Sequence, residues 1–300
     1  MSKIKSYLME LRAPFFTGSI VPVVLGGAIA WHNTHKFSWT LFFATLIGAV
    51  LIHAAANVMN DYFDHRSGDD EANTEFVRPF TGGSRMIQNG LLSPREVFIE
   101  GVILYAVGAV IGIWLAVTRG MPILYIGIIG MVTSFFYTAP PFKFVHRGIG
   151  EIFIALNFGA LTVLGAYYVQ TQTLSWIPVI ASIPVSLLIM LILYINEFQD
   201  YKADRSVGKN HWVVRLGRKR ASTGYAVFLG VTYLSVIVGV IMRAVPVWSL
   251  AVLLTLPIAF KAVRVARSNY DDPKALTPAN AMTIKLHLLI GLMLAGSYLI

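Results

Sequence analysis

Two stretches of the sequence place amide and carboxylate side chains at helical spacing. In NDYFDHRSGDDE, Asn60 and Asp64 lie four residues apart and therefore share one face of a helix. In NEFQDYKADRSVGK, the residues Asn196, Asp200 and Asp204 repeat the same interval. Oxygen ligands of this kind suit Mg²⁺, which retains several waters and bridges to substrate phosphates. Two such helix ends that face each other would form one magnesium site.

Further polar residues extend the first motif. Gly68 is expected to end the helix, and the carboxylates of Asp69 and Asp70 follow it, so that either could serve the metal. The predicted metal ligands are Asn60, Asp64, Asp69, Asn196, Asp200 and Asp204. The residues expected to lie in the cavity beside the metal are His53, Asn57 and Asp61. For His53, a histidine that packs between helices is the alternative.

Basic residues occupy the loops around both motifs. Their side chains suit phosphate oxygens, which they bind by charge-assisted hydrogen bonds. The predicted diphosphate-binding residues are Arg66, Arg78, Arg85, Lys143, Arg147, Arg205 and Lys209. For Lys143 and Arg147, a role in membrane topology alone is the alternative. Acidic and basic residues together, next to apolar helices, indicate a ligand with a diphosphate head and a hydrocarbon tail.

The elements that must position these residues are membrane helices. Of the 300 residues, 56% are hydrophobic and 13% are charged, with a mean hydropathy of +0.66, whereas about a quarter of a soluble domain is charged. The absence of cysteine excludes thiolate catalysis and disulfides. We expect an all-α polytopic protein, one domain over residues 1–300, with nine transmembrane helices in one bundle. The predicted spans are 14–31, 39–59, 96–117, 121–138, 149–170, 176–198, 221–242, 246–263 and 279–299.

The distribution of Lys and Arg predicts the orientation of this bundle. With the N-terminus inside, only Lys36, Arg119 and Arg243 fall in outer segments, and nearly all other basic residues fall in inner ones. Both acidic motifs then lie on the cytoplasmic side of the cell membrane, at the ends of the second and sixth spans. Their separation by four spans indicates duplicated halves. The net charge of +9 is explained by topology, so nucleic acid is not an expected partner.

Three stretches also carry a resemblance to a known family. They are NDYFD from Asn60, DYKADRSVGK from Asp200 and YTAPPFKFVHRGIGE from Tyr137. On these, the chain resembles the intramembrane prenyltransferases of the UbiA superfamily over roughly residues 10–220. The resemblance implies Mg²⁺-dependent transfer of a polyprenyl group from its diphosphate to an aromatic acceptor. It also implies that Asp64, Asp200 and Tyr137 are catalytic, with the Tyr137 ring facing an allylic carbocation; an interfacial tyrosine is the alternative.

Three shorter stretches are similar to one branch of that superfamily. They are GGSRMIQNG from Gly82, FGALTVLGAYYVQ from Phe158 and VVRLGR from Val213. This similarity implies 1,4-dihydroxy-2-naphthoate as the acceptor, in menaquinone biosynthesis. The chain departs from the superfamily at Gly68, where many relatives have a third Asp, and at Gln199, where they often have Arg.

Other interpretations remain open from the sequence. The acceptor could be 4-hydroxybenzoate or a lipid glycerol. A secondary transporter is the alternative from another class, although transporters usually hold their ionisable residues near mid-span. Glu151 is expected to pair with Arg147 or to act as an acidic residue at a helix N-terminus.

Overall fold

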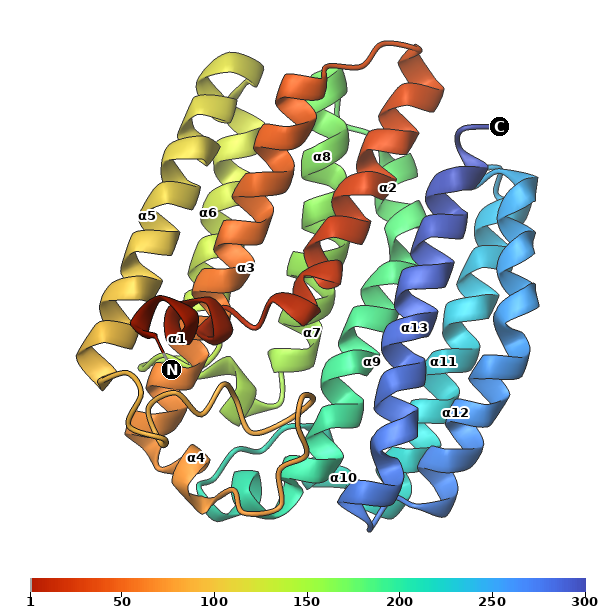
Figure 1. Ribbon diagram of the computed structural model, residues 1–300. Coiled ribbons are helices and arrows are strands. Elements are labelled where there is room, and N and C mark those ends of the chain that lie inside the picture. Colours follow the sequence, from red (N-terminus) through yellow and green to blue (C-terminus); the bar gives the residue numbers. More distant parts are fainter. Residues whose placement is uncertain (1) are drawn as a thin grey trace.

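The computed structural model describes residues 2–300, and these residues form helices and connecting loops without a β-strand. The long helices run side by side, and the short α1 lies in front of α3 and α5 in the view of Figure 1. The elements are α1 (Lys3–Glu10), η1 (Ala13–Phe16), α2 (Thr17–Thr34), α3 (Trp39–Ser67), α4 (Asp69–Ala72), α5 (Pro94–Arg119), α6 (Met121–Phe135), η2 (Phe144–Arg147), α7 (Gly150–Ala155), η3 (Leu156–Leu161), α8 (Thr162–Thr171), α9 (Trp176–Ser206), α10 (Trp212–Leu216), α11 (Arg218–Ile241), η4 (Val247–Thr255), α12 (Leu256–Ser268) and α13 (Pro273–Ser297).

Within residues 2–300, eight helical runs are long and apolar enough to cross a membrane. They correspond to eight of the nine predicted spans. The predicted span 121–138 is the exception, because α6 has only 15 residues, which rise about 22 Å against an apolar bilayer thickness of about 30 Å. The all-helical membrane fold is therefore confirmed. Within residues 2–300, however, eight helical runs are long enough to cross a membrane, where nine were expected.

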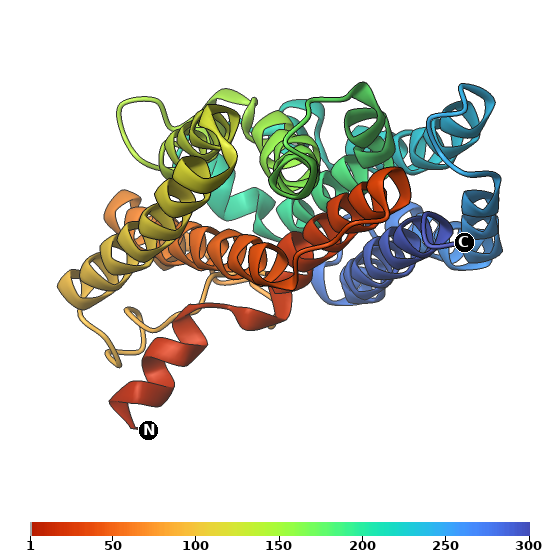
Figure 2. The ribbon, with the colours of Figure 1, turned by 90° about the horizontal axis from the view of Figure 1, so that it is seen from above.

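The bundle is elongated when it is seen from above, with α5 and α6 toward one end and α11 and α12 toward the other (Figure 2). The large apolar core lies among α2, α9, α11 and α13, where Leu188, Tyr194 and Tyr225 are fully buried. α3 packs chiefly against α5. Many side chains on the outer helix faces are apolar and exposed, such as Val117 and Leu254, as expected where lipid replaces water.

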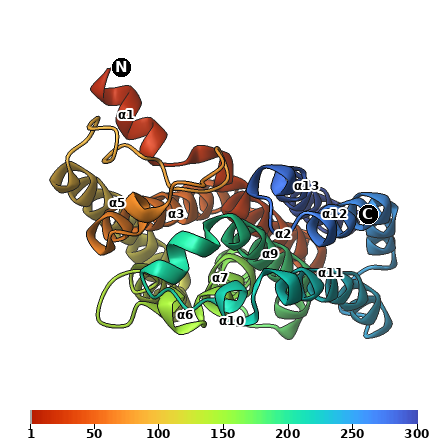
Figure 3. The same ribbon diagram turned by 90° about the horizontal axis from the view of Figure 1, so that it is seen from below.

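The connections at one end of the bundle fold over the ends of α3 and α9. α4 and α10 lie at this end (Figure 3); α4 contacts both α3 and α9, whereas α10 contacts α9. Gly68 ends α3 as predicted, because its left-handed backbone (φ 79°) lets its N–H bond the carbonyls of Asp64 and His65. The chain then turns directly into α4. This turn places Asp69 and Asp70 next to the end of the helix that carries the first motif.

A π-helical segment interrupts the fifth predicted span. In η3, the backbone bonds reach one residue further than in an α-helix, which changes the direction of the side chains; such segments are frequent at functional sites. Asn157 accepts a hydrogen bond from Thr133 of α6 at 2.9 Å. Gly159 lies so close to α9 that an added Cβ would be 1.8 Å from the Ser186 hydroxyl. The segment therefore fixes Asn157 and Phe158 against α6 and α9.

Candidate active site

A cavity of about 210 Å³ opens between α3, α9 and the loops at the end of the bundle where α4 and α10 lie. The ends of α3 and α9 contribute facing polar side chains, and α4 and the loop before α10 contribute others. The predicted residues that line this cavity are His53, Asn57, Asn60, Asp64, Asp69, Tyr137, Asn196, Asp200, Asp204 and Lys209. The two acidic motifs thus face one common space.

Lys209 is the centre of the acidic part of this cavity. Its ammonium lies 3.0 Å from Asp64 Oδ1 and 3.4 Å from Asp204 Oδ1, and it also donates to Asp69 Oδ2. These carboxylates come from α3, α9 and α4, so their positions in the sequence do not indicate that they lie close together. The Lys209 side chain is only 7% exposed. A buried positive charge here is stabilised by three carboxylates.

The remaining motif residues form a second layer of contacts. Asp200 Oδ1 accepts from Asn73 Nδ2 at 2.6 Å, and Asn60 Nδ2 donates to Asp64 Oδ2 at 3.0 Å. Asn196 Oδ1 accepts from Asn280 of α13 at 2.7 Å. These bonds hold the amide and carboxylate oxygens at the cavity wall, so that little side-chain entropy remains to be lost when a ligand binds.

The donor set fits a hard divalent cation. Carboxylate oxygens of Asp64, Asp69 and Asp204 already surround one positive charge, that of Lys209. Asp69 Oδ1 is buried and has no hydrogen-bond partner among the described residues, so it is an unused acceptor, and such buried acceptors usually have a partner. Oxygen-only ligands of this kind suit Mg²⁺ better than a transition metal.

The electrostatics of the loop residues agree with this interpretation. Burial raises the pKa of Asp69 to about 7, although Lys209 opposes the effect, and burial with the nearby Asp64 raises the pKa of Asp70 to about 9. Burial alone would lower the pKa of Lys209, but Asp64, Asp204 and Asp69 outweigh it and raise that pKa. Repulsion between neighbouring carboxylates thus adds to burial in raising the pKa of Asp69 and that of Asp70.

Most of the predicted diphosphate-binding residues lie away from the cavity wall. Of the seven, only Lys209 lines it within residues 2–300. Arg78 donates to Ser84 O at 2.7 Å and Arg85 donates to Asp70 O at 2.5 Å, so both stabilise loop backbone. Arg66 and Arg205 each donate to a tyrosine hydroxyl one helical turn earlier, and Arg147 donates to Pro141 O. Lys143 adopts a left-handed backbone conformation ahead of η2.

Asp61, predicted as a cavity residue, lies behind the cavity lining. Its Oδ2 accepts from the Ser84 backbone N–H at 2.7 Å. The Ser84 hydroxyl in turn donates to Glu10 of α1. Gly83 must remain a glycine here, because its φ is 65° and an added Cβ would lie 2.9 Å from Asp61 Oδ1. Asp61 therefore fixes the loop that covers the cavity.

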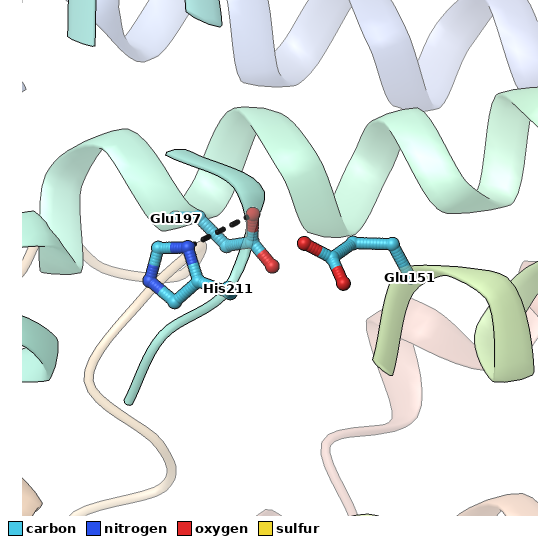
Figure 4. A group of neighbouring side chains, drawn as sticks. All are labelled: Glu151, Glu197 and His211. Atoms are coloured by element: carbon cyan, nitrogen blue, oxygen red, sulfur yellow. Dashed lines mark ion pairs between the residues drawn. The ribbon is translucent and has the colours of Figure 1, made fainter. Parts of the chain in front are cut away.

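Glu151, Glu197 and His211 form a buried cluster beside the acidic motif. Their ligand atoms lie within 4.8 Å of one another, and the two carboxylates point toward each other in Figure 4. His211 Nε2 lies 2.9 Å from Asp204 Oδ2, while its Nδ1 lies 3.3 Å from Glu197 Oε2. Burial lowers the pKa of His211, but Glu197 and Asp204 reverse this and raise it to about 10. The two carboxylates thus favour the protonated form of His211.

The position of Glu151 corrects one expectation and agrees with another. No ion pair with Arg147 forms among the described residues; Glu151 Oε1 instead accepts from the Trp212 backbone N–H at 2.5 Å. Glu151 does lie in the first turn of α7, as the alternative expected. It therefore anchors the first residue of α10 to the fifth predicted span.

Aromatic and apolar side chains form the rest of the cavity. Tyr137 and Phe158 line it, and the His53 and Phe158 ring centroids are 4.5 Å apart. His53 Nδ1 lies 2.9 Å from the Ser19 hydroxyl, which agrees with the packing role that was the alternative for this residue. His53 and Phe158 also border a second, largely apolar cavity of about 290 Å³ between α3, α5, α6 and α8, called the apolar chamber below.

Several residues of the site escaped the sequence-based prediction. Among them are Arg12, Asn157, Phe158, Glu197 and His211, all of which line the polar cavity. Glu197 follows Asn196 directly in the second motif, and His211 comes two residues after Lys209. That adjacency was an available signal. Arg12 and Asn157 belong to segments without a polar repeat, so spacing alone gave no signal for them.

Comparison with known proteins agrees with this geometry. The model of the UbiA prenyltransferase family matches residues 19–289. The chain is 28% identical to 2-carboxy-1,4-naphthoquinone phytyltransferase of Synechocystis sp., over 98% of this chain and 93% of that protein. It is 27% identical to 1,4-dihydroxy-2-naphthoate octaprenyltransferase of Bacillus subtilis, over 98% of this chain and 92% of that protein.

Solved structures support the fold independently of sequence. A UbiA homologue from Archaeoglobus fulgidus, bound to DMAPP and Mg²⁺, superposes with a TM-score of 0.64 at 17% identity, over 97% of this chain and 99% of that one. At this identity the likeness supports the fold alone. The family model covers most of the chain, and the phytyltransferase and the octaprenyltransferase match along nearly their full length. This chain therefore belongs to the UbiA prenyltransferase family and is a prenyltransferase.

Proposed function

We propose that the chain transfers a polyprenyl group from its diphosphate to 1,4-dihydroxy-2-naphthoate, with Mg²⁺ bound by the two aspartate motifs, in menaquinone biosynthesis. The observation that carries this proposal is the cavity itself. Carboxylates from α3, α4 and α9 meet a buried lysine at one end of it, and an apolar chamber adjoins the other. This arrangement suits an amphiphile with a diphosphate head and a hydrocarbon tail.

The residues that would hold the cation are Asp64, Asp69, Asp200 and Asp204, with Asn60 and Asn196 beside them. When bound, Mg²⁺ supplies charge stabilisation for the departing diphosphate. Lys209 is placed to donate hydrogen bonds to the same phosphate oxygens, because its ammonium already lies among three of the carboxylates. Arg78 and Arg85 would act indirectly, since they hold the backbone of the covering loop. We assign Arg66, Lys143, Arg147 and Arg205 to the positive potential around the mouth.

The reaction proposed is an ionisation followed by attack of the ring. The C–O bond of the prenyl diphosphate breaks, and the electron pair leaves with the diphosphate. The allylic cation that remains must be protected from water, and Tyr137 with its aromatic neighbours provides a dry wall and a π face. The tail would occupy the apolar chamber, whose lining is almost entirely hydrophobic.

The acceptor carbon attacks the cation and forms the new C–C bond. In 1,4-dihydroxy-2-naphthoate this carbon carries the carboxylate, which leaves as CO₂ and returns its electron pair to the ring. Support comes from the relatives named for carboxylated naphthoquinone and dihydroxynaphthoate substrates. The competing acceptor is 4-hydroxybenzoate, from which no carboxylate would be lost.

We also propose that α6 crosses the membrane, giving nine crossings, with the acidic motifs on the cytoplasmic side. α6 leads from the end of the bundle opposite the site back to the site (Figure 1). The N-terminal helix lies at the site end and the C-terminus at the other, which requires an odd number of crossings. The residues after α6, with Phe136 bonded to Val132 O, lengthen the helical segment.

The test is a reconstitution with purified protein in detergent or lipid. The protein receives one prenyl diphosphate, Mg²⁺ and an equimolar mixture of 1,4-dihydroxy-2-naphthoate and 4-hydroxybenzoate. We expect diphosphate release that EDTA abolishes, and a prenylated naphthohydroquinone whose mass lacks the carboxylate. Selective prenylation of hydroxybenzoate would overturn the acceptor assignment alone. Transfer that proceeds in EDTA would overturn the metal assignment.

A further inference from the structure

Arg12 is a cavity residue that the proposed mechanism does not use. It lies between α1 and η1 and lines the polar cavity. Its backbone is left-handed, with φ 56° and ψ 45°, a conformation that non-glycine residues seldom adopt and that is found most often where the surroundings impose it. Asn57 of α3 donates to Leu11 O at 3.1 Å and fixes this corner of the chain. The backbone from which the Arg12 side chain extends is therefore held in place beside α3.

The guanidinium of Arg12 has unused hydrogen-bonding capacity. An arginine has five N–H donors, and within residues 2–300 the Arg12 side chain makes one ion pair and one cation–π contact but no hydrogen bond. Asp61 Oδ1 is 3.7 Å from Nη1, beyond hydrogen-bond distance, and the Phe15 ring centroid is 5.0 Å from Cζ. The side chain is only 19% exposed. A largely buried group of this kind normally has partners, so its donors point to a ligand.

Arg12 differs in this respect from Lys209, the other permanently charged cation of the cavity wall. Lys209 is surrounded by three carboxylates, so the protein already balances its charge. Arg12 forms one ion pair, with Asp61 of α3 at 3.7 Å, and the Glu10 carboxyl is also close enough to interact with its charge. The anionic group that it can hold in addition must come from a substrate, and a planar guanidinium matches a carboxylate by two parallel bonds.

The surroundings of Arg12 suit a flat aromatic ring. Phe15, His53 and Phe158 line the same cavity. The His53 ring contacts Phe158 at 4.5 Å and Phe16 at 5.5 Å between centroids, in edge-to-face arrangements. The Asn57 and Thr17 side chains also line this wall. This aromatic part of the cavity borders the apolar chamber, where the proposed prenyl tail would lie, so a ring held here would lie beside the tail.

We propose that Arg12 binds the carboxylate of the aromatic acceptor and so selects an aromatic acid over the same ring without the acid group. This inference rests on the proposed prenyl transfer to an aromatic ring. The diphosphate is assigned to the part of the cavity where the aspartate motifs and Lys209 meet. Arg12 therefore orients the acceptor, whereas the aspartate motifs bind the departing diphosphate.

The test compares two acceptors that differ only in the carboxylate. These are 1,4-dihydroxy-2-naphthoate and 1,4-dihydroxynaphthalene, each with the same prenyl diphosphate. For Arg12→Gln, we expect the KM for the acid to rise by about 10- to 100-fold, the effect of losing a charge-assisted pair. The KM values for the carboxylate-free ring and for the prenyl diphosphate should change by less than about twofold. Arg12→Lys, which keeps the charge without the planar fork, should be intermediate.

Arg95→Gln is the matched control, because Arg95 is an exposed arginine at the same end of the bundle, in the first turn of α5, and does not line the cavity. It should leave both acceptors unaffected. Equal losses with the acid and the neutral ring in Arg12→Gln would mean that Arg12 only supports Asp61 or the loop. A rise confined to the KM for the prenyl diphosphate would mean that Arg12 binds the diphosphate. Either result overturns the proposal.

A binding measurement separates this proposal from the function on which it rests. Calorimetry with 1-hydroxy-2-naphthoate, 4-hydroxybenzoate and 1-naphthol needs no turnover. If the unaltered protein prenylates no carboxylated ring, the proposed function fails. Binding of an aromatic acid that is lost in Arg12→Gln would then still support the carboxylate site. Binding of acids and 1-naphthol that is equal in the two proteins would overturn it.

Discussion

Asp64 and Asp200 reach the same cavity from different helices, and each already has a protein partner. Asp64 Oδ1 lies 3.0 Å from the Lys209 ammonium, and Asp200 Oδ1 accepts from Asn73. If both help to stabilise the departing diphosphate through Mg²⁺, the loss of one such contact should cost about 10²- to 10³-fold in rate. We expect Asp64→Asn and Asp200→Asn to lower kcat by about this factor, measured as diphosphate release at saturating substrate.

The control for these variants is Asp271→Asn, which removes a carboxylate from an exposed loop outside the cavity. It should leave kcat unchanged. Melting temperatures of all three variants should stay close to that of the unaltered protein, because an amide keeps the shape of the side chain. Near-normal turnover of both motif variants at saturating Mg²⁺ would remove these residues from the metal site.

Variants of Tyr137 can show whether its aromatic ring or its hydroxyl is needed next to the reacting carbon. The ring lines the cavity, and the Gly150 backbone lies so close that an added Cβ would be 2.9 Å from Tyr137 Cε2. A cation over an aromatic face is stabilised by about 0.5–2 kcal/mol. Tyr137→Phe should therefore retain most of kcat, whereas Tyr137→Leu should lose about three- to thirtyfold.

Single-turnover rates with excess protein are the appropriate measurement, because product release is then excluded. If Tyr137→Phe were as slow as Tyr137→Leu, the hydroxyl would carry the function. If neither variant slowed the chemical step, Tyr137 would be a wall residue without a role in stabilising the cation. The same pair of variants therefore separates the catalytic interpretation from the interfacial one.

Helical spacing indicated which motif residues share a helix face, whereas their role in binding a metal stays a prediction. Asn60 and Asp64, like Asn196, Asp200 and Asp204, line one cavity because residues four apart share a helix face. Spacing carries no information on which loop arginine turns inward. Arg78 and Arg85 were predicted to bind diphosphate because they are basic residues next to the first motif. Their side chains instead donate hydrogen bonds to backbone carbonyls of the loop. Arg12 escaped prediction because only the fold brings the N-terminal segment to α3.

The apolar chamber lies among four helices that expose small residues to it. Gly112, Gly130 and Gly165 are part of its lining. An added Cβ at Gly130 would meet no atom within 4 Å, so a side chain there needs no displacement of the protein. If the prenyl tail occupies the chamber, Gly130→Leu should reduce the space available. We expect turnover with long prenyl diphosphates to fall several-fold relative to turnover with short ones.

The measurement is the ratio of kcat/KM for a long and a short prenyl diphosphate, which cancels effects on protein concentration and on the metal site. The matched control is Gly230→Leu in α11, because Gly230 also has open space around it but lines neither cavity. An unchanged ratio in Gly130→Leu, or an equal change in the control, would place the tail elsewhere.

Hydrophobic length predicted the helices well and their irregularities poorly. The runs that became α3, α5 and α9 were found because each has about twenty apolar residues. The short α6 was predicted as a longer span, because the apolar run continues past Phe135 while the backbone turns there. The π-helical η3 depends on contacts with Thr133 and Ser186 in other helices, which no local pattern records.

The molecule as a whole has chemically different ends. α4, α10 and the N-terminal helix lie toward one end (Figure 3), and residues of this end line the polar cavity. The opposite end holds the short connections between α2 and α3, between α5 and α6 and between α8 and α9. Because most Lys and Arg flank the cavity end, the positive-inside rule predicts that this end faces the cytoplasm. A prenyl diphosphate made in the cytoplasm would then meet the site directly.

The absence of cysteine makes this orientation directly measurable. Single cysteines can be placed at exposed positions by Asn89→Cys and Lys219→Cys at the cavity end and by Lys36→Cys and Thr173→Cys at the other. In intact spheroplasts, a membrane-impermeant maleimide should label only Lys36→Cys and Thr173→Cys. All four should react after permeabilisation, which controls for accessibility.

Each outcome of the labelling bears on a different part of the topology. Labelling of both cavity-end cysteines in intact cells, without the other two, would reverse the orientation and place the site outside. Labelling of Thr173→Cys but not Lys36→Cys would put the ends of α2 and α8 on different sides. The parallel arrangement of α3 and α9 needs both ends on one side, because only then do their acidic motifs meet. Such a split would therefore contradict the shared cavity as well as the nine crossings.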